Sequence, residues 1–173
     1  MRRVLVIGSC GAGKSVFSRR LGAVTGLPVI HLDRHFWRPG WVEPEKDAWW
    51  RQVEGLLKGE AWIIDGNYGR TMDLRLASCD TAIFLDFPRH VCLWRVCKRA
   101  VQYSGRSRPD IADGCPEKID WDFIKWTWGY PERSRPSVID RLARVSGKVS
   151  VITLHNDRET DEYLASLQPP NGN

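Results

Sequence analysis

The sequence predicts an α/β fold, in which helices cover a central parallel sheet of five strands, in a single domain that spans residues 1–173. Short apolar runs of strand length alternate along the chain with longer segments whose apolar residues recur at helical spacing. In the first run, Arg3–Ile7, the apolar residues are consecutive, which is typical of a strand buried on both faces. A glycine-rich turn and then a helical pattern follow this run, as the crossover connections of a parallel sheet require.

The remaining elements follow from the same patterns. Further strands are expected at Pro28–Leu32, Ala61–Ile64, Ala82–Leu85 and Val149–Leu154. Helices are expected at Lys14–Val24, Glu45–Lys58, Arg89–Val101 and Asp157–Leu167. The residues from Asp33 to Pro44 are expected to form a loop. Large apolar side chains at helical or strand spacing are expected to face the core, namely Trp49, Trp62, Leu93, Trp94, Cys97 and Val101.

The interval 102–147 predicts a helical lid insertion between the third helix and the last strand. Its edges are rich in Arg, Pro and Gly, and helices are expected around Trp121–Trp128 and Val138–Val145 with a break near Gly129. A long insertion of this kind is typical of a segment that closes over a binding site.

The turn after the first strand carries the strongest chemical signal. Its residues match the pattern G-x-x-x-x-G-K-[ST], and they are Gly8, Ser9, Cys10, Gly11, Ala12, Gly13, Lys14 and Ser15. The glycines let successive backbone N–H groups point at a phosphate, and the helix that begins at Lys14 adds the positive end of its dipole. The motif predicts that Lys14 reaches the β- and γ-phosphates of ATP or GTP and that the Ser15 hydroxyl binds Mg²⁺. This Walker A motif therefore predicts a three-layer P-loop NTPase fold.

The composition restricts the class of protein and its partners. Of the 26 basic residues 19 are Arg, whose planar guanidinium suits the phosphates of a nucleotide or of a nucleic acid. No run approaches the roughly 20 apolar residues of a membrane span, and the N-terminal apolar run is shorter than the roughly 7–15 residues of a signal peptide core. We therefore expect a cytoplasmic protein without a membrane partner. Five cysteines without a C-x-x-C pair argue against a zinc site or a disulfide framework.

Two features favour transfer of the phosphoryl group to an acceptor over hydrolysis. The third strand delivers Asp65-Gly66 without an adjacent glutamate to activate water. The arginine-rich insertion suits a kinase, because phosphoryl transfer must be shielded from water. Two alternatives stay open: an NTP-binding protein that acts on DNA through its basic surface, and a nucleotide-binding regulator without turnover.

The chain resembles the adenylate-kinase-like group of P-loop kinases. Asp65-Gly66 followed by Arg70 is similar to the D-G-[FY]-P-R segment of nucleoside monophosphate kinases, although here the segment reads Asp-Gly-Asn-Tyr-Gly-Arg. The run Leu85–Pro88 followed by Arg95 and Arg99 is similar to the strand and helix that lead to their lid. The resemblance implies ATP-dependent phosphoryl transfer, and the departure leaves the acceptor open.

A closer resemblance is to bacterial proteins labelled as DNA topology modulation or adenylate-kinase-related proteins. It rests on His31-Leu32-Asp33, Trp37, Pro39-Gly40-Trp41 and Asp65-Gly66-Asn67-Tyr68. The label implies an effect on DNA, whereas the residues resemble those of a kinase.

Strand ends supply further candidate site residues. Asp65 is the candidate Mg²⁺ ligand, since ligands bind at the carboxyl ends of strands in open α/β sheets; capping of a turn is the alternative. Asp86 also ends a strand, but it precedes a proline, which favours a structural role. Asp33 is the candidate group to accept the proton of the acceptor hydroxyl or to hydrogen-bond it, with a helix cap or a loop ion pair as the alternative.

Other candidates would contact the acceptor or the transferring phosphoryl group. Trp37, Asn67 and Arg70 are candidate substrate contacts, with a solvated surface arginine as the alternative for Arg70. The arginines that would neutralise the developing charge are Arg95, Arg99, Arg106 and Arg108, with a plain exposed basic face as the alternative. A small-molecule acceptor is the expected partner, and nucleic acid is less favoured because no signature of a nucleic-acid-binding domain is present.

Overall fold

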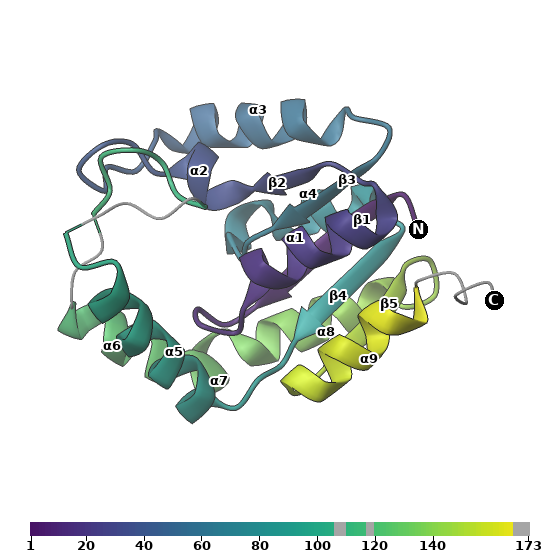
Figure 1. The fold of residues 1–173 in the computed structure, drawn as a ribbon. Coiled ribbons are helices and arrows are strands. Elements are labelled where there is room, and N and C mark those ends of the chain that lie inside the picture. The colour runs from purple at the N-terminus through teal and green to yellow at the C-terminus, as the bar shows by residue number, and fades with distance from the viewer. Residues whose placement is uncertain (106–109, 117–119, 168–173) are drawn as a thin grey trace.

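The computed structural model describes residues 1–105, 110–116 and 120–167, and its centre is one parallel sheet (Figure 1). The strand order is β2-β3-β1-β4-β5, and every neighbouring pair is parallel. The strands are β1 Arg3–Gly8, β2 Val29–His31, β3 Trp62–Asp65, β4 Thr81–Leu85 and β5 Ser150–Leu154. The predicted five-stranded parallel sheet is thereby confirmed.

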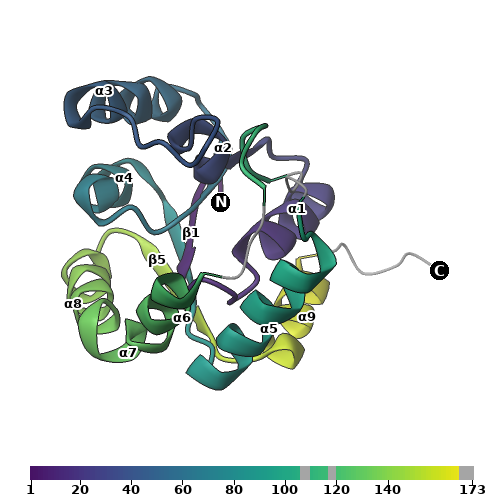
Figure 2. The same ribbon diagram turned by 90° about the vertical axis from the view of Figure 1, so that its left-hand side faces the viewer.

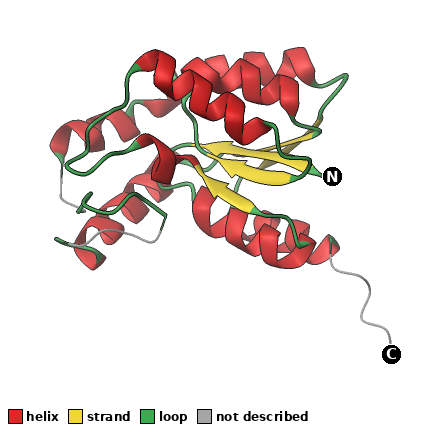
Figure 3. Ribbon diagram, turned by 90° about the horizontal axis from the view of Figure 1, so that it is seen from above, coloured by secondary structure: helices red, strands yellow, loops and turns green. Residues whose placement is uncertain are grey.

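Helices form a layer on each face of this sheet (Figures 2 and 3). The helices are α1 Lys14–Thr25, α2 Leu32–Phe36, α3 Lys46–Leu57, η1 Gly69–Thr71, α4 Met72–Ser78, α5 Arg89–Gln102, α6 Trp121–Trp128, α7 Tyr130–Arg133, α8 Arg135–Val145 and α9 Asp157–Ser166. One apolar cluster joins α3, α4 and α8 to one face of the sheet, and another joins α1, α5 and α9 to the other face. The three-layer arrangement is therefore confirmed.

The central strand β1 shows why the sheet needs both layers. Val4 and Val6 belong to the cluster under α1 and α9, whereas Leu5 and Ile7 belong to the cluster under α3, α4 and α8. All four side chains are fully buried. Period-two alternation along a strand sends apolar side chains to both faces, and burial of each stabilises the fold by roughly 1.5–3 kcal/mol.

Two local predictions were wrong. The expected loop after β2 begins with the short helix α2, so Asp33 lies in a first helical turn. The expected core face of α5 is rotated, because Trp94 is 67% exposed and Val101 is 71% exposed. The buried side of this helix is instead formed by Cys92, Val96 and Ala100. Apolar residues lie on most sides of α5, and the turn at Gly11, which packs on the Cys92 backbone, selects which side is buried.

The insertion divides into parts with different packing. Helix α6 has the predicted bounds, and Asp120 caps it by accepting hydrogen bonds from the N–H groups of Asp122 and Phe123. The chain then continues through α7 into α8, whose Val138 and Leu142 belong to the core. The end of the expected lid is thus a structural helix of one outer layer. Among the described residues, no helix is both long and apolar enough to cross a membrane.

Candidate functional site

The Walker A turn connects β1 to α1 at the carboxyl edge of the sheet. The N–H of Ala12 donates to the carbonyl oxygen of Ser9 at 3.1 Å, and α1 begins at Lys14. Gly11 is required for packing, since a Cβ there would lie 2.1 Å from the carbonyl oxygen of Cys92. Gly13 has a φ of +93°, a conformation that favours glycine. The turn therefore has the tight backbone that depends on glycine, which is the conformation that the motif needs for a phosphate site.

The Lys14 ammonium group lies across this turn. Its Nζ donates to the carbonyl oxygens of Gly8 and Ser9, each at 3.0 Å. Ser15 is half-buried in the first turn of α1. The fold therefore puts a cation, a hydroxyl and the helix N-terminus on one short stretch of backbone, as the motif predicts.

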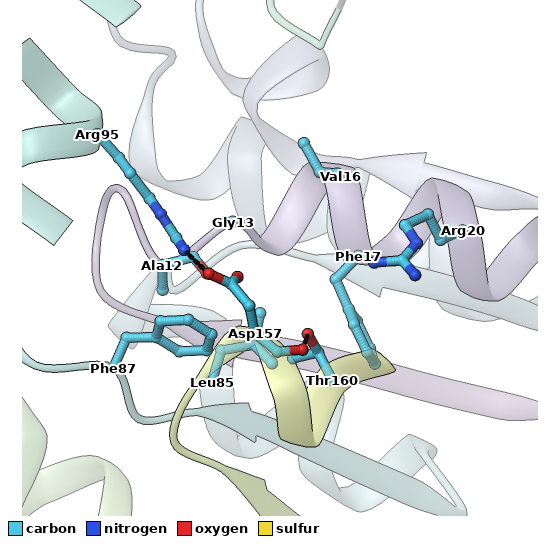
Figure 4. Close-up of a pocket in the computed structure, with 10 residues that line it drawn as sticks. All are labelled: Ala12, Gly13, Val16, Phe17, Arg20, Leu85, Phe87, Arg95, Asp157 and Thr160. Carbon is cyan, nitrogen blue, oxygen red and sulfur yellow. Dashed lines mark hydrogen bonds and ion pairs between the residues drawn. The ribbon is translucent and has the colours of Figure 1, made fainter. Parts of the chain in front are cut away.

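A pocket of about 250 Å³ lies beside the turn, between α1, α5 and the N-terminus of α9 (Figure 4). Arg95 from α5 reaches across it, where one Nη lies 2.6 Å from the Asp157 carboxylate and the other lies 3.4 Å from the Ala12 carbonyl oxygen. The guanidinium carbon also lies 4.9 Å from the centre of the Phe87 ring. The sequence indicated Arg95 but missed Phe87, which follows β4, and Asp157, which begins α9, because these segments share no motif.

Asp65 ends β3 next to β1 and is 2% exposed. Its Oδ2 lies 2.6 Å from Nδ1 of His31, the neighbouring residue in β2. The hydroxyl of Ser15 and the carboxylate of Asp65 are oxygen ligands of the kind that Mg²⁺ takes together with water and nucleotide phosphates. Among the described residues, no group of three or more His, Cys, Asp or Glu side chains is arranged to hold a metal ion without such help.

The other strand-end carboxylate, Asp86, has a protein partner for both oxygens. Arg135 donates to Oδ1 from Nε at 2.7 Å and to Oδ2 from an Nη at 2.6 Å. This bidentate pair ties the start of α8 to the end of β4, so Asp86 has a structural contact of the kind that the sequence suggested.

The loop after β3 connects the Walker A turn to the candidate acceptor side. The Asn67 side-chain oxygen accepts a hydrogen bond from the Gly8 N–H at 3.0 Å. The Tyr68 hydroxyl donates to Oδ1 of Asp33 at 2.6 Å. Burial, together with the nearby Asp33 carboxylate, raises the pKa of the Tyr68 hydroxyl, so this hydroxyl stays a donor. Asn67, a candidate substrate contact, also contacts the Walker A turn through its side-chain oxygen.

An aromatic cluster lies against Tyr68, the hydrogen-bond partner of Asp33. Phe36 lies 4.6 Å from Tyr68 and 4.9 Å from Trp37 between ring centroids, and Trp37 lies 5.3 Å from Trp41. Trp37 is half-buried, whereas Arg70 in η1 is exposed. The candidate acceptor side is therefore an acid set beside an aromatic cluster.

The insertion reaches this same side of the molecule. The Gly40 N–H donates to the Gly114 carbonyl oxygen at 2.8 Å, and Trp41 Nε1 donates to the Pro116 carbonyl oxygen at 3.1 Å. Arg99 is half-buried on α5, one turn beyond Arg95. The remaining two candidate arginines, Arg106 and Arg108, lie outside the described residues.

The sequence gives no sign that Arg75 is a buried residue of this region. Arg75 in α4 is fully buried, and its guanidinium group donates to carbonyl oxygens of the loop after β3. From the sequence, an arginine is expected to be exposed to solvent. Only the tertiary structure shows that Arg75 is buried.

Comparison with known proteins places the chain by fold. No family model matches the sequence, and no curated protein matches it. A solved shikimate kinase from Acinetobacter baumannii in complex with shikimate is similar with a TM-score of 0.61 at 13% identity, over 96% of this chain and 90% of that chain. A gluconokinase from Sinorhizobium meliloti 1021 is similar with a TM-score of 0.54 at 17% identity, over 96% of this chain and 93% of that chain.

A putative kinase from Chloroflexus aurantiacus j-10-fl gives a comparable result, with a TM-score of 0.53 at 15% identity, over 96% of this chain and 97% of that chain. At such identities the likeness is one of fold. The resemblance to the topology modulation proteins is not confirmed by these comparisons. The five-stranded parallel sheet with helices on both faces is the P-loop fold that the similar kinase structures share.

Proposed function

We propose that this chain is a small kinase that transfers the γ-phosphoryl group of ATP or GTP to a small hydroxyl or phosphate acceptor, with Mg²⁺. The observation that carries the proposal is the juxtaposition at the sheet edge of a Walker A turn with Lys14 across it and, one loop away, the Asp33–Tyr68 pair. Phosphoryl transfer needs such an arrangement, because catalysis consists mainly of positioning and of neutralising charge. The likeness of fold to solved kinases supports it.

On the donor side, the backbone N–H groups of the turn would hold the phosphates. The Lys14 ammonium group would exchange its hydrogen bonds to the Gly8 and Ser9 carbonyl oxygens for hydrogen bonds to phosphate oxygens. Ser15 and Asp65 would hold Mg²⁺, which supplies charge neutralisation between the β- and γ-phosphates. The pocket crossed by Arg95 is the proposed nucleoside site, since its Phe17 and Phe87 rings offer apolar surface beside the turn (Figure 4). Arg99, with Arg106 and Arg108, is proposed to neutralise the transferring group.

On the acceptor side, Asp33 would accept the acceptor's proton or hold its hydroxyl, with the Tyr68 O–H fixing the carboxylate. Trp37 would supply an aromatic surface beside it, and Arg70 a cation for a phosphate or carboxylate on the acceptor. The insertion contacts the loop that bears Trp41, and this contact supports a role for the insertion in covering this side. The DNA-binding alternative gains no support from the similar structures.

The decisive experiment follows ADP release with Mg²⁺-ATP across a panel of nucleosides, monophosphates, sugars and small hydroxy acids, and repeats the panel with Mg²⁺-GTP. We expect one acceptor class to raise turnover well above the basal rate. Lys14→Ala should remove that stimulation, with a fall of about 100-fold or more. Lys148→Ala, at an exposed lysine at the opposite edge of the sheet, is the matched control and should leave turnover unchanged. Nucleotide binding without stimulation by any acceptor would overturn the kinase proposal.

A further inference from the structure

Arg75 is a buried charge that contacts the loop after β3 with both Nη atoms, while its Nε donates to the Thr71 carbonyl oxygen at 3.3 Å. Its side chain is 0% exposed. Nη1 donates to the Gly66 carbonyl oxygen at 2.7 Å, and Nη2 donates to those of Asn67 at 2.6 Å and Tyr68 at 3.0 Å. Burial lowers the pKa of Arg75 to about 9, so the guanidinium stays charged near neutral pH. Burying a cation is costly, and filling this space would need only a methionine or a leucine.

The loop needs an external partner to keep its shape. Three successive carbonyl groups, those of residues 66–68, converge on one guanidinium group. Gly66 has a φ of +129°, and Tyr68 has a φ of +25° although it is not a glycine. Such backbone persists only where surrounding contacts determine it, and the Arg75 hydrogen bonds are such contacts.

The same loop contacts both sides of the proposed reaction site. Asn67 accepts from the Gly8 N–H at the start of the phosphate-binding turn. Tyr68 donates to Asp33 on the acceptor side. A shift of the loop would therefore move the acid relative to the phosphates, and a misplacement of about 1 Å can cost about 100-fold in rate.

We propose that Arg75 is a positioning residue: by fixing the carbonyl groups of residues 66–68, it sets the place of Asp33 relative to the phosphate-binding turn. This inference rests on the proposed kinase function. It adds a residue that touches neither nucleotide nor acceptor and acts through Asn67 and Tyr68.

The test compares Arg75→Lys with Arg141→Lys in steady-state kinetics and nucleotide binding. Arg141 is the matched control, because it donates to the Gly69 carbonyl oxygen at 3.0 Å, one residue beyond the loop. Arg75→Lys keeps the charge but loses the fork geometry. We expect its kcat to fall about 10- to 100-fold while the Kd for nucleotide changes less than about threefold, since backbone groups hold the phosphates. Arg141→Lys should change neither constant. Equal falls in both variants, or a loss of nucleotide affinity equal to the loss of kcat, would overturn the inference.

A double-mutant cycle gives a readout that does not depend on turnover. If Arg75 acts through Tyr68, the combined variant of Arg75→Lys and Tyr68→Phe should lose less thermal stability than the two single variants together. Additive losses would count against the inference. Where Arg75→Lys does not fold, Tyr68→Phe carries the test, and an unchanged kcat in it would overturn the coupling to Asp33. A wild-type protein that phosphorylates no acceptor but shows the non-additive cycle would refute the proposed function while leaving the Arg75 contact network supported.

Discussion

The donor and acceptor sides of the proposed site are built in opposite ways. The proposed donor side comes from eight consecutive residues, Gly8–Ser15, and would work through backbone N–H groups and one lysine. The acceptor side brings together side chains from α2, from the loop after β3 and from the aromatic cluster of Phe36, Trp37, Trp41, Trp49 and Tyr68. A site made from contiguous backbone tolerates little change in shape, whereas a site made from scattered side chains can change its ligand by substitution.

The largest expected effect tests the acceptor side alone. Asp33→Asn keeps the size of the side chain but removes the base, so kcat should fall roughly 100- to 10,000-fold with nucleotide binding unchanged. Asp47→Asn is the control, because Asp47 also lies in the first turn of a helix and is exposed, so it reproduces any effect of removing a charge there. The measurements are kcat with the best acceptor and the Kd for nucleotide, each for the wild type and both variants. A variant that loses nucleotide binding and turnover together would show that the two sides are not separable.

The next effect tests the shape of the donor side. Gly11→Ala would drive a Cβ into the backbone of α5 at a φ of +80°, and we expect the free energy of unfolding to fall by about 3 kcal/mol or more. Gly26→Ala is the control, since Gly26 has a φ of +72° but no atom within 4 Å of the added Cβ. Its cost, about 1–2 kcal/mol, reports backbone strain alone. Denaturant unfolding measures both, and equal losses would mean that the contact with α5 is soft.

The secondary structure predicted from the sequence is right where the signal lies within one segment. The apolar run before Gly8 and the helical pattern after Lys14 indicated β1 and α1, and the alternation of elements indicated a five-stranded parallel sheet. The predicted buried side of α5 is wrong, because apolar residues lie on most sides of this helix. The buried side is determined only when the Walker A turn packs on Cys92. The helices α2 and α4 are not predicted either, because they are short and are stabilised by their contacts with other elements.

The site divides along the same line. Lys14 and Ser15 could be assigned from the motif, because the chemistry requires those residues at that spacing. Asp33 and Asp65 could be indicated only by their places at strand ends. Their partners, Tyr68 and His31, come from other segments, and no pattern within one segment reports a contact between side chains that are 34 or 35 residues apart. Arg75 needed the tertiary structure for the same reason.

A smaller effect tests whether the insertion belongs to the acceptor side. Gly114 has a φ of +77°, and a Cβ there would lie 2.9 Å from Cβ of Pro39, in the loop that bears Trp41. Gly114→Ala should raise the acceptor KM several-fold by disturbing this contact, with a stability loss of about 1–3 kcal/mol. Gly105→Ala, at a φ of +70° with open space around it, is the control within the same insertion. An acceptor KM that is unchanged in Gly114→Ala would remove the insertion from the acceptor side.

The smallest effect should leave both sides untouched. Asp80 lies at the opposite edge of the sheet, where its Oδ2 accepts hydrogen bonds from the N–H groups of Arg2 at 2.7 Å and Arg3 at 2.8 Å. Burial raises the pKa of Asp80, but the hydrogen bonds from Thr81, Arg3 and Arg2 outweigh this and hold it below its usual 3.8.

Because the folded protein favours the ionised carboxylate, the stabilisation from Asp80 is present above the pKa of the unfolded chain, near 3.8, and is lost as the pH falls through the lower folded value. Asp80→Asn should therefore lower the free energy of unfolding at pH 7 by less than about 1 kcal/mol, because solvent screens an exposed carboxylate. The melting temperature should fall slightly as a result. The difference from wild type should shrink as the pH falls below 3.8. Both kcat and the nucleotide Kd should stay at their wild-type values. A change in either constant would show that the strand register set at this edge reaches the site, and that β1 transmits strain to the phosphate-binding turn.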